Sequence, residues 1–224
     1  MINFLVGIFM VFGPVLGYVS QYKTIEKTRN TEGFSLKVSL ILFLSNILRC
    51  FFWMGKQFDI TLLYQSLVMI VAQLVMLNLC VSLKSQDQLV NTKSRKSTLT
   101  SSFTNQDFWD WDSIFPYLLF LGGYTFIFFM TSYYFLYVPE YFELLGSLSL
   151  TIEATLGLPQ LLQNYKKHNV KGLSFVLIAS WFVGDFAKTL YFYFSGAPVQ
   201  FIICGAFQLI VDVAITYQLF FYPQ

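Results

Sequence analysis

Charge is what this sequence has least of. Lys, Arg, Asp and Glu make up 12% of its 224 residues, about half the usual 25% of a soluble domain. One histidine, His168, and three isolated cysteines exclude a His-based triad, a disulfide framework and a CxxC metal site. The net charge of +2 gives no reason to expect a nucleic-acid partner. Neither GxxxxGK[ST] nor GxGxxG occurs, so we expect no cofactor, no metal site and no enzyme.

Apolar and aromatic residues are abundant instead. The chain is 56% hydrophobic and contains 26 Phe, 14 Tyr and 4 Trp. About 20 consecutive apolar residues are enough to cross a bilayer. Seven apolar segments without the alternation of barrel strands predict an all-α membrane protein with seven transmembrane helices. The predicted spans are 3–22, 37–55, 60–83, 114–138, 142–165, 173–194 and 198–222.

Basic residues between the spans lie almost entirely on one side of the membrane. The loops after spans one, three and five, with the start of span two, hold eleven Lys and Arg, whereas the other side holds Lys56 alone. Cytosolic loops are the ones that carry excess positive charge. The pattern therefore predicts a lumenal N-terminus and a cytosolic C-terminus.

The first three predicted helices repeat as the last three at a constant offset of 139 residues. This offset aligns scarce polar residues, namely Gln21 with Gln160, Lys27 with Lys166, Asn30 with Asn169, Gly33 with Gly172, Ser35 with Ser174, Asn46 with Asp185, Arg49 with Lys188 and Gln73 with Asp212. Both triplets point the same way, because one span separates them. We expect two parallel triple-helix bundles, a 3+1+3 arrangement typical of carriers. The expected segments are a first bundle over 1–83, a cytosolic linker over 84–113, a linker helix over 114–138 and a second bundle over 139–224.

Five ionisable residues fall at membrane depth: Arg49, Glu153, Asp185, Lys188 and Asp212. Each charge costs about 2.5–3.5 kcal/mol there unless it finds a partner or water. Asp185 and Lys188 are three residues apart and can pair, whereas Arg49 needs Glu153 or Asp212 from another helix. The surplus carboxyl, Glu153 or Asp212, could carry a proton.

These five residues, with Asn46 and Gln73, are the candidate substrate path. The alternative is that they only join the helices by interhelical hydrogen bonds.

Prolines mark two further positions. Pro14 lies in the first span and Pro159 in the fifth, and each residue removes a helical hydrogen bond and is expected to kink its helix. Gln21 and Gln160 occupy equivalent places in the two copies, and Gln160 is expected to contact the freed carbonyl or a ligand. A hinge for alternating access and a static kink both fit these residues.

Aromatic residues also gather just before the fourth span, in Phe108-Trp109-Asp110-Trp111. Trp favours the headgroup zone, so an interfacial aromatic belt is the favoured interpretation. A cytosolic element that gates the groove or touches headgroups is the alternative.

The second copy reads Glu153-Ala-Thr-Leu-Gly157-Leu-Pro159-Gln160, then a basic loop and Gly172-Leu-Ser174. In this motif, and over nearly its whole length, the chain resembles the PQ-loop repeat family (solute carrier family 66). The resemblance implies kinship with lysosomal cystine and cationic amino-acid exporters, SWEETs and the KDEL receptor. Residues 46–53, 108–111 and 196–201 are most similar to a subgroup associated with phospholipid translocation. The first copy departs from the family pattern, because Ser20 precedes Gln21 where the family has proline.

Three functions fit these observations. The resemblance favours a scramblase-like protein that moves phospholipid between leaflets of endosome and Golgi membranes and supports traffic between them. The alternatives are a proton-coupled transporter of a small polar solute such as an amino acid, and a KDEL-receptor-like cargo receptor. Membrane lipids are the expected partners. A homodimer, a link to the P-type flippase pathway and a lysosomal location are further expectations.

Overall fold

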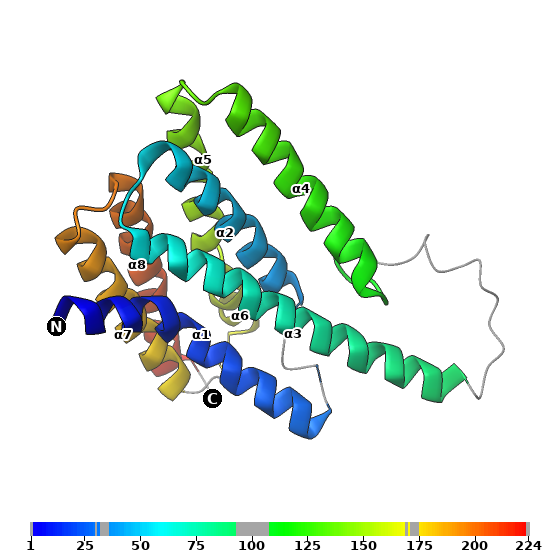
Figure 1. Ribbon diagram of the computed structural model, residues 1–224. Helices are drawn as coiled ribbons and strands as arrows, with labels where there is room; N and C mark the ends of the chain where they lie inside the picture. The colour runs from blue at the N-terminus through cyan, green and yellow to red at the C-terminus, as the bar shows by residue number, and fades with distance from the viewer. Residues whose placement is uncertain are drawn as a thin grey trace.

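The structure is a computed structural model that describes residues 2–29, 31, 36–92, 108–168, 170 and 175–222 (Figure 1). Helices account for nearly all of these residues, and the described part of the chain contains no strand. The helices are α1 (Ile2–Thr28), α2 (Leu36–Lys56), α3 (Ile60–Thr92), α4 (Ile114–Tyr134), α5 (Pro139–Ala154), α6 (Leu158–Lys167), α7 (Phe175–Phe194) and α8 (Val199–Phe221). The prediction of an all-α protein is confirmed.

Four segments within the described residues are long and apolar enough to cross a membrane: Leu36–Lys56, Ile60–Lys84, Ile114–Tyr134 and Val199–Phe221. The predicted total of seven spans stays a prediction. The ends of α2, α4, α7 and α8 agree with the predicted spans to within a few residues. However, α3 continues to Thr92, into the segment predicted as linker, because nothing between Lys84 and Thr92 breaks a helix.

The predicted span 142–165 forms two helices rather than one kinked helix. α5 ends at Ala154, and the amides of Thr155 and Leu156 bond three residues back to the carbonyls of Ile152 and Glu153. α6 then begins at Leu158, with Pro159 in its first turn. Proline is tolerated there because the first turn has no partner for its missing N–H. The proline therefore marks the start of a new helix.

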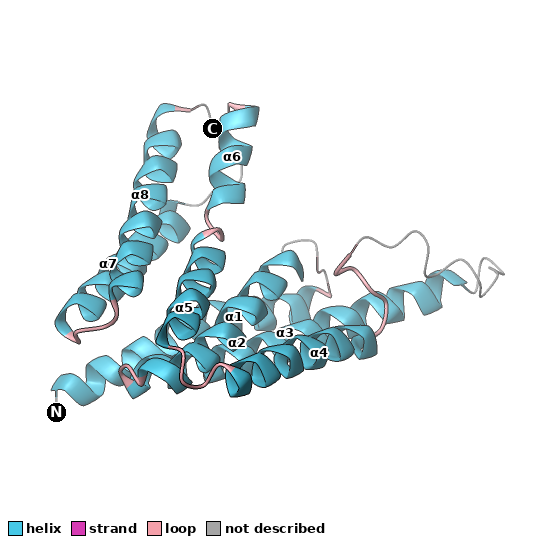
Figure 2. Cartoon of the chain, turned by 90° about the horizontal axis from the view of Figure 1, so that it is seen from above, coloured by secondary structure: helices cyan, strands magenta, loops and turns pink. Residues whose placement is uncertain are grey.

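The helices form two groups related by the sequence repeat. A shift of 139 residues places the starts of α2 and α3 on the starts of α7 and α8, and α1 on α5 together with α6. In the first group α3 packs against α1 and α2, and in the second α8 packs against α5, α6 and α7. Each group is therefore built around its last helix, and Figure 2 shows α6 and α7 beside α8.

α2 and α5 join the two groups along an extensive seam. A Cβ atom added to Gly55 of α2 would lie 2.1 Å from Phe142 of α5, and one added to Gly146 of α5 would lie 2.6 Å from Phe52 of α2. Each glycine thus accepts an aromatic ring from the opposite helix. This close approach brings charged side chains of the two groups together.

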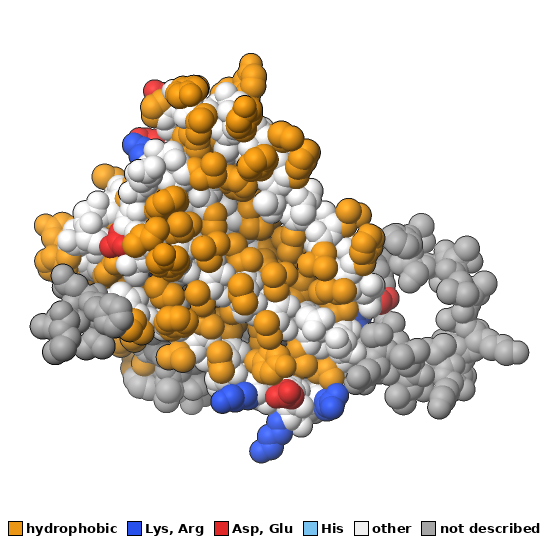
Figure 3. All heavy atoms as spheres, in the orientation of Figure 1, with side chains coloured by type: hydrophobic (Ala, Val, Ile, Leu, Met, Phe, Trp, Pro, Cys, Tyr) orange, Lys and Arg blue, Asp and Glu red, His pale blue; other side chains and the backbone are white. Residues whose placement is uncertain are grey.

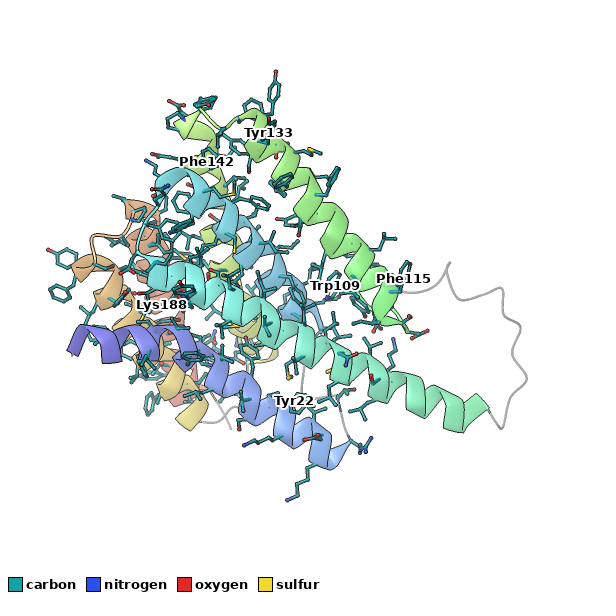
Figure 4. The ribbon with its side chains drawn as sticks, in the orientation of Figure 1. Tyr22, Trp109, Phe115, Tyr133, Phe142 and Lys188 are labelled. Carbon is teal, nitrogen blue, oxygen red and sulfur yellow. The ribbon has the colours of Figure 1, made fainter. Side chains whose placement is uncertain are left out.

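Trp109, in the aromatic patch before α4, is part of the protein core, whereas its neighbour Phe108 is 56% exposed. Trp109 is 1% exposed and contacts Phe43, Tyr117 and Phe120, and it lies between α4 and the first group (Figure 4). Lys84 of α3 binds the carboxylates of Asp110 and Asp112 at 2.9 Å each. The prediction of an interfacial belt is therefore wrong for Trp109, because these contacts fold its segment onto α2 and α4.

The outside of the molecule is apolar. On the face in Figure 3, hydrophobic side chains cover most of the surface and charged ones lie at its margins. α4 is the most exposed of the apolar helices, and its Phe115 and Tyr133 are 67% and 74% exposed. Such a surface is suited to lipid rather than water, because large contiguous apolar patches are rare on soluble monomers.

Candidate functional site

Three charged side chains from three helices meet inside the molecule, and we refer to Arg49, Glu153 and Lys188 as the ion triad. The guanidinium of Arg49 on α2 pairs with Glu153 Oε2 on α5. Lys188 on α7 is labelled in Figure 4, and its Nζ lies 2.6 Å from Glu153 Oε1 and donates to it. Arg49 is 1% exposed and Glu153 8%. One carboxylate therefore holds cations from both repeats.

Aromatic rings cover the ion triad on one side. The Arg49 guanidinium lies 5.5 Å from the centre of the Phe201 ring, and Lys188 Nζ lies 5.7 Å from that of Phe192. Phe192 and Phe201 pack edge to face at 5.0 Å, and Phe58 contacts Phe201 at the same distance. The rings stabilise the cations through their faces and exclude water, which strengthens the charge interactions.

The structure decides between the two predicted partners of Arg49. Glu153 is the partner, and Asp212 is not. The predicted pairing of Lys188 with Asp185 is wrong, because Lys188 binds Glu153. Asp185 also lies within interaction distance of Asp212 on α8. Two carboxylates side by side repel each other, and a proton shared between them would remove that repulsion.

The two repeats contribute different charged residues to the ion triad, and the sequence shows why. The offset of 139 residues pairs Arg49 with Lys188, so each repeat supplies one cation. The same offset pairs Glu153 with Pro14, so only the second repeat supplies a carboxylate. Both cations therefore converge on one acid, and the ion triad has a net charge of +1.

Asn46 and Gln73 serve their own bundle. Asn46 donates to the Leu42 carbonyl one turn earlier on α2 at 2.8 Å. Gln73 on α3 accepts a 2.8 Å hydrogen bond from Ser39 on α2. Both side chains are buried, yet neither contacts the ion triad through a hydrogen bond among the described residues. Their geometry matches the alternative of interhelical and local hydrogen bonding.

The proline–glutamine positions lie away from the ion triad. Pro14 is exposed within an unbroken α1, and Gln21 lies two turns further along the same helix. Pro159 and Gln160 are in the first turn of α6, and their side chains fall outside the described residues. A role as hinge for any of these four residues stays a prediction.

Sequence reasoning missed the contacts that close the molecule where α2 turns into α3. Tyr191 of α7 donates to Asp59 Oδ2 at 2.7 Å, and Lys56 pairs with Glu143 of α5 at 2.5 Å. Partial burial raises the pKa of Asp59, but hydrogen bonds from Thr61 and Tyr191 outweigh it and leave that pKa below its usual value. No shared spacing marks these residues, so only their position beside span ends could have suggested them.

This fold and its charged centre define a multi-pass helical membrane protein built from two triple-helix bundles. A family model described as PQ loop repeat matches residues 2–62 and 141–201, and the chain belongs to this family. The two matches are offset by 139 positions at both ends, which confirms the repeat found in the sequence.

Two relatives extend the comparison. The chain is 24% identical to a protein named Scramblase ANY1 from Saccharomyces cerevisiae, over 99% of this chain and 72% of that protein. It also shares the fold of a eukaryotic SWEET transporter, with a TM-score of 0.56 at 17% identity, over 95% of this chain and 94% of the other. The SWEET likeness shows the architecture, and the yeast relative supports a scramblase-like membrane protein.

Proposed function

We propose that this protein moves phospholipid between the two leaflets of endosome and Golgi membranes and supports endosome-to-Golgi traffic. The observation that carries the proposal is the ion triad, a charged centre enclosed by helices whose outer surfaces are apolar. A polar headgroup needs such a centre to cross, while acyl chains remain against the apolar surface. The name of the yeast relative supports the same activity. The headgroup would cross without covalent chemistry or cofactor.

The test is reconstitution of the full chain into liposomes that carry a fluorescent phospholipid in both leaflets. An impermeant quencher added outside is expected to remove more than the outer-leaflet signal when the protein is present. Arg49→Ala should return the signal toward that of protein-free vesicles, since it removes a charge of the centre. Equal quenching with and without wild-type protein would overturn the proposal.

The acid pair of Asp185 and Asp212 favours a second candidate, proton-coupled transport of a small polar solute such as an amino acid. In the same liposomes, an imposed pH gradient would then drive amino-acid uptake that Asp212→Asn abolishes.

We place the N-terminus in the lumen and the C-terminus in the cytosol. A homodimer and a link to the P-type flippase pathway stay predictions.

A further inference from the structure

The two seams between the repeats are unequal. The repeat relates the seam of α2 and α5 to a seam of α7 and α1. α2 packs closely along α5 through Gly55 and Gly146, whereas α1 meets α7 over a short stretch only. The α1–α7 seam is also the one that lacks a carboxylate, because Pro14 stands at the position equivalent to Glu153. Packing and charge are thus incomplete at the same place.

Lys188 borders this open seam. Gly184 precedes it by one helical turn on the same face of α7, and a Cβ added to Gly184 would meet no atom within 4 Å. A Cβ added to Gly17 of α1 would likewise meet open space. The Lys188 side chain is 12% exposed, whereas that of Arg49 is 2% exposed. Of the two cations, Lys188 is the more accessible to a ligand at this seam.

Lys188 also retains hydrogen-bonding capacity. An ammonium group has three N–H donors, and among the described residues Glu153 is the one hydrogen-bond acceptor for Lys188. Asp185 attracts Lys188 electrostatically but forms no hydrogen bond with it among the described residues. The ion triad therefore offers positive charge and free donors toward the α1–α7 seam.

We propose that the α1–α7 seam binds the phosphate group of a membrane phospholipid, with Lys188 as its ligand in place of the carboxylate that the first repeat lacks. This inference rests on the proposed function and names the headgroup chemistry it selects. A phosphodiester carries one negative charge and neutralises the net charge of the ion triad. Trp181, one turn beyond Gly184 on the same face of α7, is 36% exposed and suits acyl chains. Asp185 repels the phosphate, which keeps binding weak enough for release.

The first test measures lipid retention by native mass spectrometry of the full-length protein in detergent. Lys188→Met removes the ammonium and leaves the neutral pair of Arg49 and Glu153, so the fold is preserved. We expect it to lower retention of phosphatidylcholine at least about tenfold, as for the loss of a charge-assisted hydrogen bond, with no effect on glucosylceramide, which has no phosphate. Lys188→Arg should restore retention, and Asp185→Asn should raise it.

The matched control is Lys56→Met, which removes the same charge from a pair outside the seam and should change neither lipid. Pro14→Glu supplies the missing carboxylate and should lower phosphatidylcholine retention, whereas Pro14→Gln should not. Equal loss of both lipids in Lys188→Met, or unchanged phosphatidylcholine retention, would overturn the inference.

A second measurement separates this inference from the proposed function. If the wild-type protein scrambles both lipids in the liposome assay, Lys188→Met should slow the scrambling of phosphatidylcholine and leave that of glucosylceramide unchanged. Scrambling by the wild type that is equally fast in Lys188→Met would sink the phosphate site alone. Selective phosphatidylcholine retention without any scrambling by the wild type would sink the proposed function and leave the phosphate site standing.

Discussion

At the scale of single residues, Glu153 is the member of the ion triad on which the others depend. It holds Arg49 and Lys188 through its two carboxylate oxygens. When a buried ion pair loses one partner, the remaining charge is uncompensated. This costs more free energy of unfolding than the intact pair contributes. Removing each of the three charges is therefore expected to lower stability by a different amount.

Stability should fall in the order Glu153→Gln, Arg49→Met, Lys188→Met. Glu153→Gln leaves two buried cations without a carboxylate and should cost about 3–5 kcal/mol of unfolding free energy. Arg49→Met leaves Lys188 to neutralise Glu153 and should cost less. Lys188→Met leaves a one-to-one pair and should cost least. Chemical denaturation in detergent micelles measures these differences.

A partly exposed ion pair provides the comparison for this order. Lys56 and Glu143 have 36% and 48% of their side chains exposed. Solvent screens such pairs and they contribute little to stability, so Glu143→Gln should have little effect. If Lys188→Met destabilised the protein more than Glu153→Gln, the shared-carboxylate description would be wrong.

At the scale of elements, the seam of α2 and α5 positions the ion triad. Phe142 and Phe52 pack on Gly55 and Gly146, and Ser149 of α5 donates to the Ser45 carbonyl of α2 at 2.7 Å. The small residues let the two backbones approach closely, as in other membrane helix pairs. Because Arg49 and Glu153 lie on these same helices, their pairing depends on that approach.

Gly146→Val is expected to separate α2 from α5. The new side chain would overlap Phe52, whose nearest ring atom lies 2.6 Å from the added Cβ. Overpacking of this kind costs about 1–3 kcal/mol, and thermal unfolding followed by tryptophan fluorescence measures it.

The control for this prediction is Gly123→Val on α4, where an added Cβ meets no atom within 4 Å. It introduces the same side chain into an apolar helix without a clash. Similar melting temperatures for the two variants would show that the seam is not tightly packed.

At the scale of the whole molecule, two polar links between the groups lie at one end, where α2 turns into α3. Asp59 and Tyr191 link the turn after α2 to α7, and Lys56 links the end of α2 to α5. Phe52, Phe58 and Phe201 form an aromatic cluster that also joins the two groups. This end is closed in the structure, whereas the α1–α7 seam is open.

The hydrogen bond of Asp59 and Tyr191 should persist at endosomal pH. Hydrogen bonds from Thr61 and Tyr191 leave the pKa of Asp59 below the usual value of about 3.9. A group with a lowered folded-state pKa contributes stability that is present above its unfolded pKa and lost as pH falls through the folded one. The stability difference between wild type and Tyr191→Phe should therefore be constant from pH 7 to about pH 4 and shrink below that. A difference that disappears already near pH 5–6 would contradict this.

The sequence predicted much of the architecture but less of the site. Hydropathy predicted helix positions because it reports each segment's preference for lipid. The offset of 139 residues predicted the two parallel bundles, and the two matches of the family model, at 2–62 and 141–201, have the same offset. Arg49 was correctly expected to have a partner on another helix, but Glu153 and Asp212 could not be separated. The partners of Lys188 and Asp185 were wrong, since spacing along one helix says nothing about closer groups on its neighbours.

The sequence by itself determined that this is a helical membrane protein with a repeated plan and a few charges enclosed in apolar segments. It did so because burial in lipid restricts composition along every helix. Only the tertiary structure decided which charges meet, that Trp109 is buried, and that one seam is closed and the other open. These outcomes depend on distances between helices, and such distances are set by side-chain packing across Gly55 and Gly146 rather than by any local pattern.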